Sequence, residues 1–225
     1  MRFDIMTLFP DMVRSVLDES ILGRAQKSGC IEIHTHQIRE YSLDRHRRVD
    51  DTPYGGGKGM LMGPEPIWRC YEAVKAQTEG LRRRVLYMSP QGKVLTQRRA
   101  EALASYENLV ILCGHYEGVD QRILDEIVEE EISIGDYVLT GGELPACILV
   151  DCVSRLLPGV LADSECYENE SISCGMLEYP QYTRPPVFRG RGVPQVLLDG
   201  NHREIEQWRY RMALEKTKKQ RPDLL

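Results

Sequence analysis

Short apolar runs alternate along the chain with segments of helical periodicity, and this alternation limits the choice of fold most strongly. Residues 109–113 (LVILC) are nearly all apolar, as in a strand covered on both faces. Further strands are expected at residues 2–9, 31–38, 84–89 and 131–134, and helices at 11–27, 65–77, 96–106, 121–129 and 142–157. This order predicts an α/β domain with a mainly parallel sheet.

The pattern changes near residue 159. Residues 159–174 are acidic and rich in small residues, without periodicity, which indicates a linker. A last helix is expected at residues 201–219, with Asn201 as its cap and Glu204 three residues later. We therefore expect a main domain at residues 1–159, a flexible linker at 160–175 and a small C-terminal helical domain at 176–225.

Composition restricts the partners and the compartment. The formal net charge is −5, so a nucleic acid has to bind local basic clusters such as residues 45–48, 82–84 and 216–221, each of which is otherwise a solvated face. The seven cysteines form no C-x-x-C pair, which argues against a disulfide scaffold or zinc ribbon and fits a reducing cytosol. No apolar run approaches the roughly 18 residues that span a bilayer. We expect a cytoplasmic protein without a membrane partner.

Glycine-bearing loops follow the apolar strands at residues 89–92, 114–118 and 134–143. Because ligands bind at the carboxyl ends of parallel strands, we expect these loops to form one pocket. The sequence contains neither G-x-G-x-x-G nor G-x-x-x-x-G-K, which disfavours a phosphate site. Tyr87, Tyr116, Tyr137 and Leu139 instead suit a purine nucleoside without phosphates, such as S-adenosylmethionine. Ordinary turn glycines are the alternative interpretation.

Four longer motifs resemble the bacterial tRNA (guanine-N1) methyltransferase family. They are residues 50–57 (DDTPYGGG), 113–120 (CGHYEGVD), 133–145 (SIGDYVLTGGELP) and 179–185 (YPQYTRP), and the resemblance extends over residues 1–225. It implies a deep trefoil knot in the α/β domain, an obligate homodimer, and methylation of guanine N1 at the guanosine 3′ of the anticodon, position 37 of tRNA. S-adenosylmethionine would bind the first domain and tRNA the C-terminal one. No metal and no DNA are expected.

The resemblance also implies the site residues. Glu170 and Arg155 are the expected catalytic residues, and the substrate is expected to contact Asp51, Tyr54, Gly57, Arg184 and His202. Arg203 and Arg209 are further candidates for RNA backbone contacts. The residues expected to bind the cofactor, here termed the predicted cofactor set, are Tyr87, Ser89, Pro90, Gly114, Tyr116, Glu117, Ser133, Ile134, Gly135, Tyr137, Leu139, Gly141, Gly142 and Pro145.

The expected reaction explains the two catalytic residues. Guanine N1 bears a proton and becomes nucleophilic only when a base removes it. The family places Asp before Ser in the linker, and here Glu170, one methylene longer, precedes Ser171. Arg155 presents paired donors suited to O6, where negative charge develops, or to a phosphate. The alternatives are a solvated linker acid for Glu170 and a helix-dipole partner for Arg155.

Two competing functions are left open. A knotted enzyme that methylates a ribose hydroxyl needs no acid in the linker, whereas a non-catalytic RNA-binding module binds no S-adenosylmethionine.

Lys58 is, after Glu170, a second departure from the family pattern, because the family more usually has a small residue or proline at this position. Lys58 either contacts RNA phosphate or lies in solvent.

Overall fold

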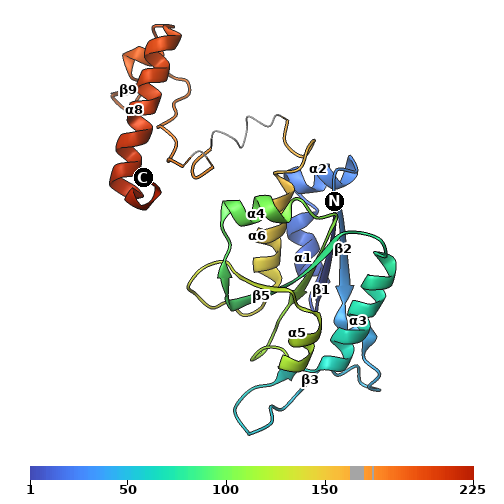
Figure 1. The fold of residues 1–225 in the computed structure, drawn as a ribbon. Coiled ribbons are helices and arrows are strands. Elements are labelled where there is room, and N and C mark those ends of the chain that lie inside the picture. The colour runs from blue at the N-terminus through green and yellow to red at the C-terminus, as the bar shows by residue number, and fades with distance from the viewer. Residues whose placement is uncertain (163–169, 174) are drawn as a thin grey trace. The chain divides into compact units, whose positions relative to one another are not determined.

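The computed structural model describes residues 1–162, 170–173 and 175–225. Half of the predicted linker at 160–175, namely residues 163–169 and 174, therefore lies outside the described residues. The chain forms two compact units, Met1–Ala162 and Asp163–Leu225 (Figure 1). Within the described ranges, no helix combines the length and the apolar character that crossing a membrane requires.

The first unit contains a five-stranded sheet in the order β2-β1-β6-β5-β7. Every pairing in this sheet is parallel. The strands are β1 (Arg2–Thr7), β2 (Glu32–Gln37), β5 (Arg83–Val94), β6 (Asn108–Cys113) and β7 (Glu130–Ser133). The mainly parallel α/β fold predicted from the sequence is therefore confirmed.

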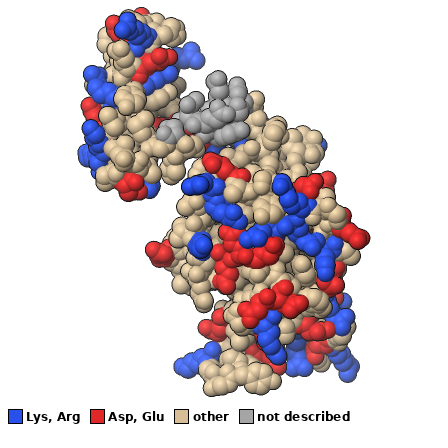
Figure 2. Space-filling view, in the orientation of Figure 1, with Lys and Arg blue, Asp and Glu red and all other residues tan. Residues whose placement is uncertain are grey.

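Helices cover both faces of the sheet (Figure 1). One hydrophobic cluster includes residues of α1 (Pro10–Leu17), α2 (Ser20–Lys27), α4 (Gln97–Leu103) and α6 (Glu143–Ser154), and the other includes residues of α3 (Pro64–Gln77) and α5 (Gln121–Ile127). Successive side chains of β6 alternate between these clusters, because side chains of a strand point to opposite faces. The central strand is thus buried on both sides, which explains its continuous apolar sequence. Outside the core, acidic and basic side chains are interspersed over the visible face of this unit (Figure 2).

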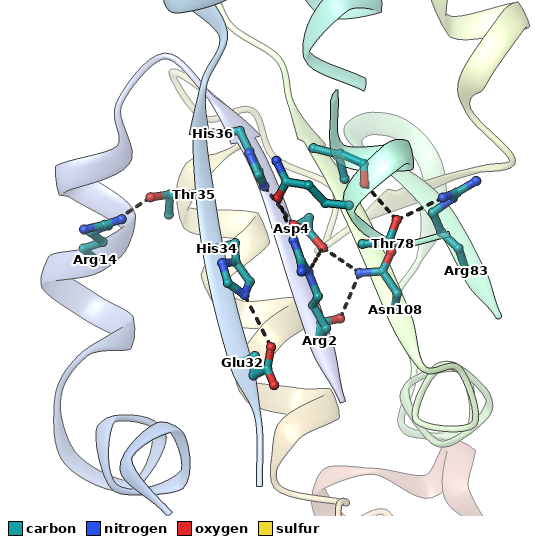
Figure 3. A network of polar contacts seen from close by, with 12 residues as sticks. Arg2, Asp4, Arg14, Glu32, His34, Thr35, His36, Thr78, Arg83 and Asn108 are labelled. Atoms are coloured by element: carbon teal, nitrogen blue, oxygen red, sulfur yellow. Dashed lines mark hydrogen bonds and ion pairs between the residues drawn. The ribbon is translucent and has the colours of Figure 1, made fainter. Parts of the chain in front are cut away.

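A buried polar network interrupts the apolar face toward α3. Asp4 of β1 is fully buried and accepts hydrogen bonds from Arg2 Nε and Nη2, both at 2.8 Å, and from Asn108 Nδ2 at 2.7 Å. His36 Nε2 lies 2.8 Å from Asp4 Oδ1, so the network joins β1, β2 and β6 (Figure 3). Burial alone would raise the pKa of Asp4, but the bonds to His36 and Arg2 outweigh it and hold the pKa below its ordinary value.

The predicted single helix at residues 11–27 is wrong. α1 ends at Leu17, and α2 begins at Ser20, whose φ is 53°. A Cβ on Gly23 would overlap the carbonyl oxygen of Asp18. Because glycine lacks that atom, the first turn of α2 packs directly against the end of α1, and two short helices replace one long helix.

Two further features differ from expectation. β5 continues past Ser89 to Val94, but Met88 and Lys93 both pair with Ile132, so residues 89–92 bulge out of the ladder. An unpredicted hairpin of β3 (Asp50–Asp51) and β4 (Leu61–Met62) encloses the glycine-rich loop, and the 3-10 helix η1 (Ile38–Tyr41) precedes it.

The second unit contains α8 (His202–Gln220), close to the helix predicted at residues 201–219. The side chain of Asn201 caps it by accepting a hydrogen bond from the backbone N of Glu204 at 3.5 Å. Trp208, Ala213 and Thr217 are the buried residues of this helix. Its described residues also form the hairpin strands β8 (Val187–Phe188) and β9 (Arg191–Gly192) and the 3-10 helices η2 (Gln195–Leu197) and η3 (Pro222–Leu224).

Candidate functional site

A cavity of about 310 Å³ lies at the carboxyl ends of β5, β6 and β7. Its volume is at the lower end of the usual range for small-molecule sites. The bulge at residues 89–92 and the loops after β6 and β7 form its wall, because parallel strands end at the same edge of a sheet. The wall includes every member of the predicted cofactor set: Tyr87, Ser89, Pro90, Gly114, Tyr116, Glu117, Ser133, Ile134, Gly135, Tyr137, Leu139, Gly141, Gly142 and Pro145.

Two glycines allow these loops to approach one another. A Cβ on Gly114 would lie 2.7 Å from the hydroxyl of Tyr87, and a Cβ on Gly142 would lie 2.8 Å from the Cα of Cys113. The backbone N of Gly142 donates a hydrogen bond to the carbonyl of Gly114 at 2.9 Å. A side chain at either position would therefore displace the wall of the cavity.

The charges around the cavity favour a particular class of ligand. The described residues that line it include Glu117 and Glu131 but no Lys or Arg. Burial, assisted by the nearby charge of Glu131, raises the pKa of Tyr87 to about 12, so this hydroxyl stays neutral at physiological pH. Carboxylates without a cation suit a positively charged ligand and oppose a phosphate. In the described part of the chain, no cluster of His, Cys, Asp and Glu could hold a metal ion.

The glycine-rich segment is attached to the cavity loop through backbone hydrogen bonds. The N of Glu117 donates to the carbonyl of Met60 at 3.0 Å, and the N of Met62 donates to the carbonyl of Gly118 at 2.9 Å. Tyr116, next to these bonds, has a φ of 59°, a left-handed conformation that is uncommon for a residue with a side chain. This strained turn places Tyr116 and Glu117 in the cavity wall.

The predicted substrate residues of the first unit lie outside the cavity wall. Asp51 belongs to β3, where its Oδ1 accepts a hydrogen bond from the backbone N of Thr52 at 2.7 Å. Tyr54 is 98% exposed on the following loop, which also contains Gly57 and the exposed Lys58. The bonds at Met60 and Met62 connect the end of this loop to the cavity.

The two predicted catalytic residues belong to different units. Arg155 follows the last residue of α6, as expected, and its backbone N donates to the carbonyl of Asp151 at 3.2 Å. It is not among the residues that line the cavity. Glu170 is partly buried in the second unit.

The segment around Glu170 is attached to the rest of the second unit. Ser171 Oγ accepts a hydrogen bond from the backbone N of Glu178 at 3.0 Å. The N of Leu177 donates to Thr217 Oγ1 of α8 at 2.9 Å. The position of the residue after Glu170 is therefore coupled to α8.

The other predicted substrate residues also belong to the second unit. Arg184 is exposed and lines a groove of about 340 Å³ together with Tyr182. His202 is the first residue of α8. The guanidinium of Arg209 lies over the ring of Tyr179, 4.9 Å from its centroid.

Sequence reasoning missed a polar contact beside the cavity. Glu143 is 3% exposed, and its Oε1 accepts a hydrogen bond at 2.8 Å from Thr7 Oγ1, 136 residues away. Thr7 Oγ1 in turn accepts from the backbone N of Phe9 at 2.9 Å. His115 lines the cavity, and its Nδ1 is buried without a hydrogen-bond partner among the described residues. Glu143 and His115 lie within the quoted motifs, but no local sequence pattern indicates that Glu143 bonds to Thr7.

Comparison with known proteins gives a consistent result. The model of the family described as tRNA (Guanine-1)-methyltransferase TrmD matches residues 1–225. The tRNA (guanine-N(1)-)-methyltransferase of Ruminiclostridium cellulolyticum is 55% identical, over 100% of this chain and 96% of that protein. Those of Lachnospira eligens and Clostridioides difficile are 57% and 51% identical over 100% of this chain, and over 94% and 97% of their own lengths. The chain therefore belongs to the tRNA (guanine-1)-methyltransferase TrmD family.

Proposed function

We propose that this protein methylates N1 of guanosine 37, the nucleoside 3′ of the anticodon in tRNA, with S-adenosylmethionine as the methyl donor. Membership of the family supports the reaction and the substrate. The observation that carries the proposal is the convergence of the whole predicted cofactor set on one cavity that contains carboxylates and no Lys or Arg among its described residues. Its bacterial relatives support a cytoplasmic site of action.

The cavity residues suit this donor. Backbone groups of the loops after β6 and β7, together with Ser89, would bind the nucleoside, and Glu117 and Glu131 would balance its positive charge. When bound, the donor supplies a methyl group on a positively charged sulfur, which is already a strong electrophile. The close packing of Gly114 against Tyr87 keeps the wall compact around the ligand.

Glu170 acts as the base that removes the proton from guanine N1. The bonds from Glu178 to Ser171 and from Leu177 to Thr217 orient its segment relative to α8. Arg155 donates hydrogen bonds to O6, where negative charge accumulates as the proton leaves. The base and the cation come from different units of the chain.

The two units divide the work. Residues 1–159 bind the donor, residues 160–175 connect the units, and residues 176–225 bind tRNA. Asp51, Tyr54, Gly57, Arg184 and His202 contact the RNA, and Arg203 and Arg209 contact its backbone. The exposure of Tyr54 and Arg184 supports contacts of this kind.

We include a deep trefoil knot and a homodimer in the proposal. The segment just before α6 lies against the loop after β6. It is held there by the hydrogen bond from Gly142 to Gly114 and by the bridge between His115 and Gly141, and this contact supports the knot. An apolar surface supports the dimer. It consists of side chains of α1, α2 and α6 and the residue before α1 that are 37% to 45% exposed: Phe9, Met12, Val16, Ile21, Leu144 and Ile148.

Two tRNA transcripts test the reaction. One carries guanosine at position 37 and the other adenosine, and mass spectrometry locates the transferred methyl group. We expect methylation of the guanine base in the first transcript only. A methylated ribose would instead identify the competing ribose methyltransferase, and the lack of any calorimetric heat with S-adenosylmethionine would identify the non-catalytic module.

Variants at the two catalytic positions test the mechanism. Glu170→Gln should lower kcat by about 10² to 10⁴ with unchanged affinity for the donor, because only the proton acceptor is lost. Glu170→Asp is the matched control and should retain most of the activity, because it keeps a carboxylate as proton acceptor. Mixed dimers of Arg155→Ala and Glu170→Gln chains should recover activity if partner chains share a site. Full activity of Glu170→Gln contradicts the proposed base, and no recovery in proven mixed dimers shows that one chain supplies both residues of a site.

A further inference from the structure

A stretch of the second unit departs from the acidic composition of the chain. No Asp or Glu occurs between Glu178 and Asp199, although the chain contains 34 acidic residues and has a net charge of −5. Three arginines and three aromatic residues lie in this stretch: Arg184, Arg189, Arg191, Tyr179, Tyr182 and Phe188. This composition concentrates positive charge and aromatic rings in one place.

The β8–β9 hairpin presents part of this stretch to solvent. Phe188 pairs with Arg191, and the turn between them consists of Arg189 at φ 49° and Gly190 at φ 76°. Positive φ at both central residues matches the twist of a tight hairpin. The side chain of Phe188 is 64% exposed, and the guanidinium of Arg189 lies 5.5 Å from the centroid of its ring.

The charges of the hairpin are not neutralised within the described part of the chain. Neither Arg189 nor Arg191 forms an ion pair with any described residue. The exposed ring of Phe188, with a guanidinium near it and two arginines beside it, suits an unpaired nucleotide. The base would stack on the ring, and the arginines would contact the phosphates.

The hairpin continues into the neighbouring groove. The backbone N of Val193 donates to the carbonyl of Pro186 at 2.9 Å and closes the base of the hairpin. Both residues line the groove of about 340 Å³ that also contains Arg184. A strand of RNA lying along this groove would therefore reach Phe188.

We propose that the β8–β9 hairpin is an RNA-binding element in which Phe188 stacks on an unpaired base of the anticodon loop and Arg189 and Arg191 contact the adjacent phosphates. This inference rests on the proposed function, since it takes tRNA as the substrate. It assigns a role to residues outside both the donor cavity and the predicted substrate set.

Binding of a tRNA transcript to the full-length protein tests the hairpin. Phe188→Ala should weaken binding about tenfold, which corresponds to about 1.4 kcal/mol. Val187→Ala removes a neighbouring side chain that is 60% exposed but cannot stack, so this matched control should bind like the unaltered protein. The double variant Arg189→Gln and Arg191→Gln should reduce the slope of log Kd against log salt by about 0.7 per arginine.

Phe188→Trp keeps an aromatic ring and should keep the affinity, and tRNA should quench its added fluorescence relative to the background of Trp68 and Trp208. A fully paired RNA helix should compete poorly with an anticodon stem-loop. Unchanged tRNA affinity in Phe188→Ala and in the double arginine variant overturns the inference and leaves a protein contact as the role of the hairpin. Methylation of guanosine 37 by the unaltered protein is measured in parallel, so failure of the hairpin and failure of the proposed function are distinguished.

Discussion

Replacement of Asp4 by Asn is expected to destabilise the first unit strongly. Asp4 is fully buried, and Arg2 and Asn108 donate hydrogen bonds to both of its oxygens. An amide at this position would turn an N–H group toward one of these donors and would remove the charge opposite Arg2. Breaking a buried ion pair from one side costs about 3–5 kcal/mol. Because the side chain of Arg2 keeps 17% of its exposure, we expect a loss near the lower end, about 3 kcal/mol.

Urea unfolding followed by circular dichroism at neutral pH measures this loss. Glu65→Gln is the control, because Glu65 forms an exposed pair with Arg69 at 2.8 Å within α3 and should contribute only about 0.5 kcal/mol. If Asp4→Asn lost less than about 1 kcal/mol, the network would stabilise the fold no more than one ordinary hydrogen bond, and the reasoning would be refuted.

The difference in unfolding free energy between the unaltered protein and Asp4→Asn should depend on pH. Because the pKa of Asp4 is lowered in the folded state, the stability from its carboxylate is present above the ordinary value of 3.8 and is lost as the pH falls through the lowered pKa. The difference in unfolding free energy between the unaltered protein and Asp4→Asn should therefore narrow in acid. A difference that stays constant from neutral pH into this acid range would show that the charge of Asp4 is not its cause.

Three further perturbations probe the surroundings of the cavity. Gly114→Ala should weaken S-adenosylmethionine binding about tenfold or more in calorimetry, because the new methyl group displaces Tyr87. Thr7→Val removes the hydroxyl bonded to the buried Glu143 and should lower the free energy of unfolding in urea by about 1–3 kcal/mol. Burial raises the pKa of Cys113 well above its ordinary value, so iodoacetamide should modify Cys113 only after unfolding, as mass spectrometry would detect. Unchanged affinity of Gly114→Ala contradicts the first prediction, and unchanged stability of Thr7→Val contradicts the second. Modification of Cys113 in the folded protein contradicts the third.

The sheet and the edge of it that borders the cavity were predictable from local patterns. Residues 109–113 are apolar at every position because β6 is covered on both faces. The loops after β6 and β7 meet because parallel strands end at one edge. The helix at residues 11–27 was predicted wrongly because its apolar residues keep their helical spacing across the break before Ser20, so periodicity contains no sign of it.

By itself, the sequence determined the class of fold, the loops at the cavity and the family, since each depends on residues close together in the chain. Only the tertiary structure decided which distant polar groups meet, as Thr7 does with Glu143 and Asp4 with His36. Periodicity and propensity act over a few residues, whereas a buried polar group has to be satisfied by whichever partner the packing of the core brings within reach. That choice depends on the whole fold, so no local pattern of residues specifies it.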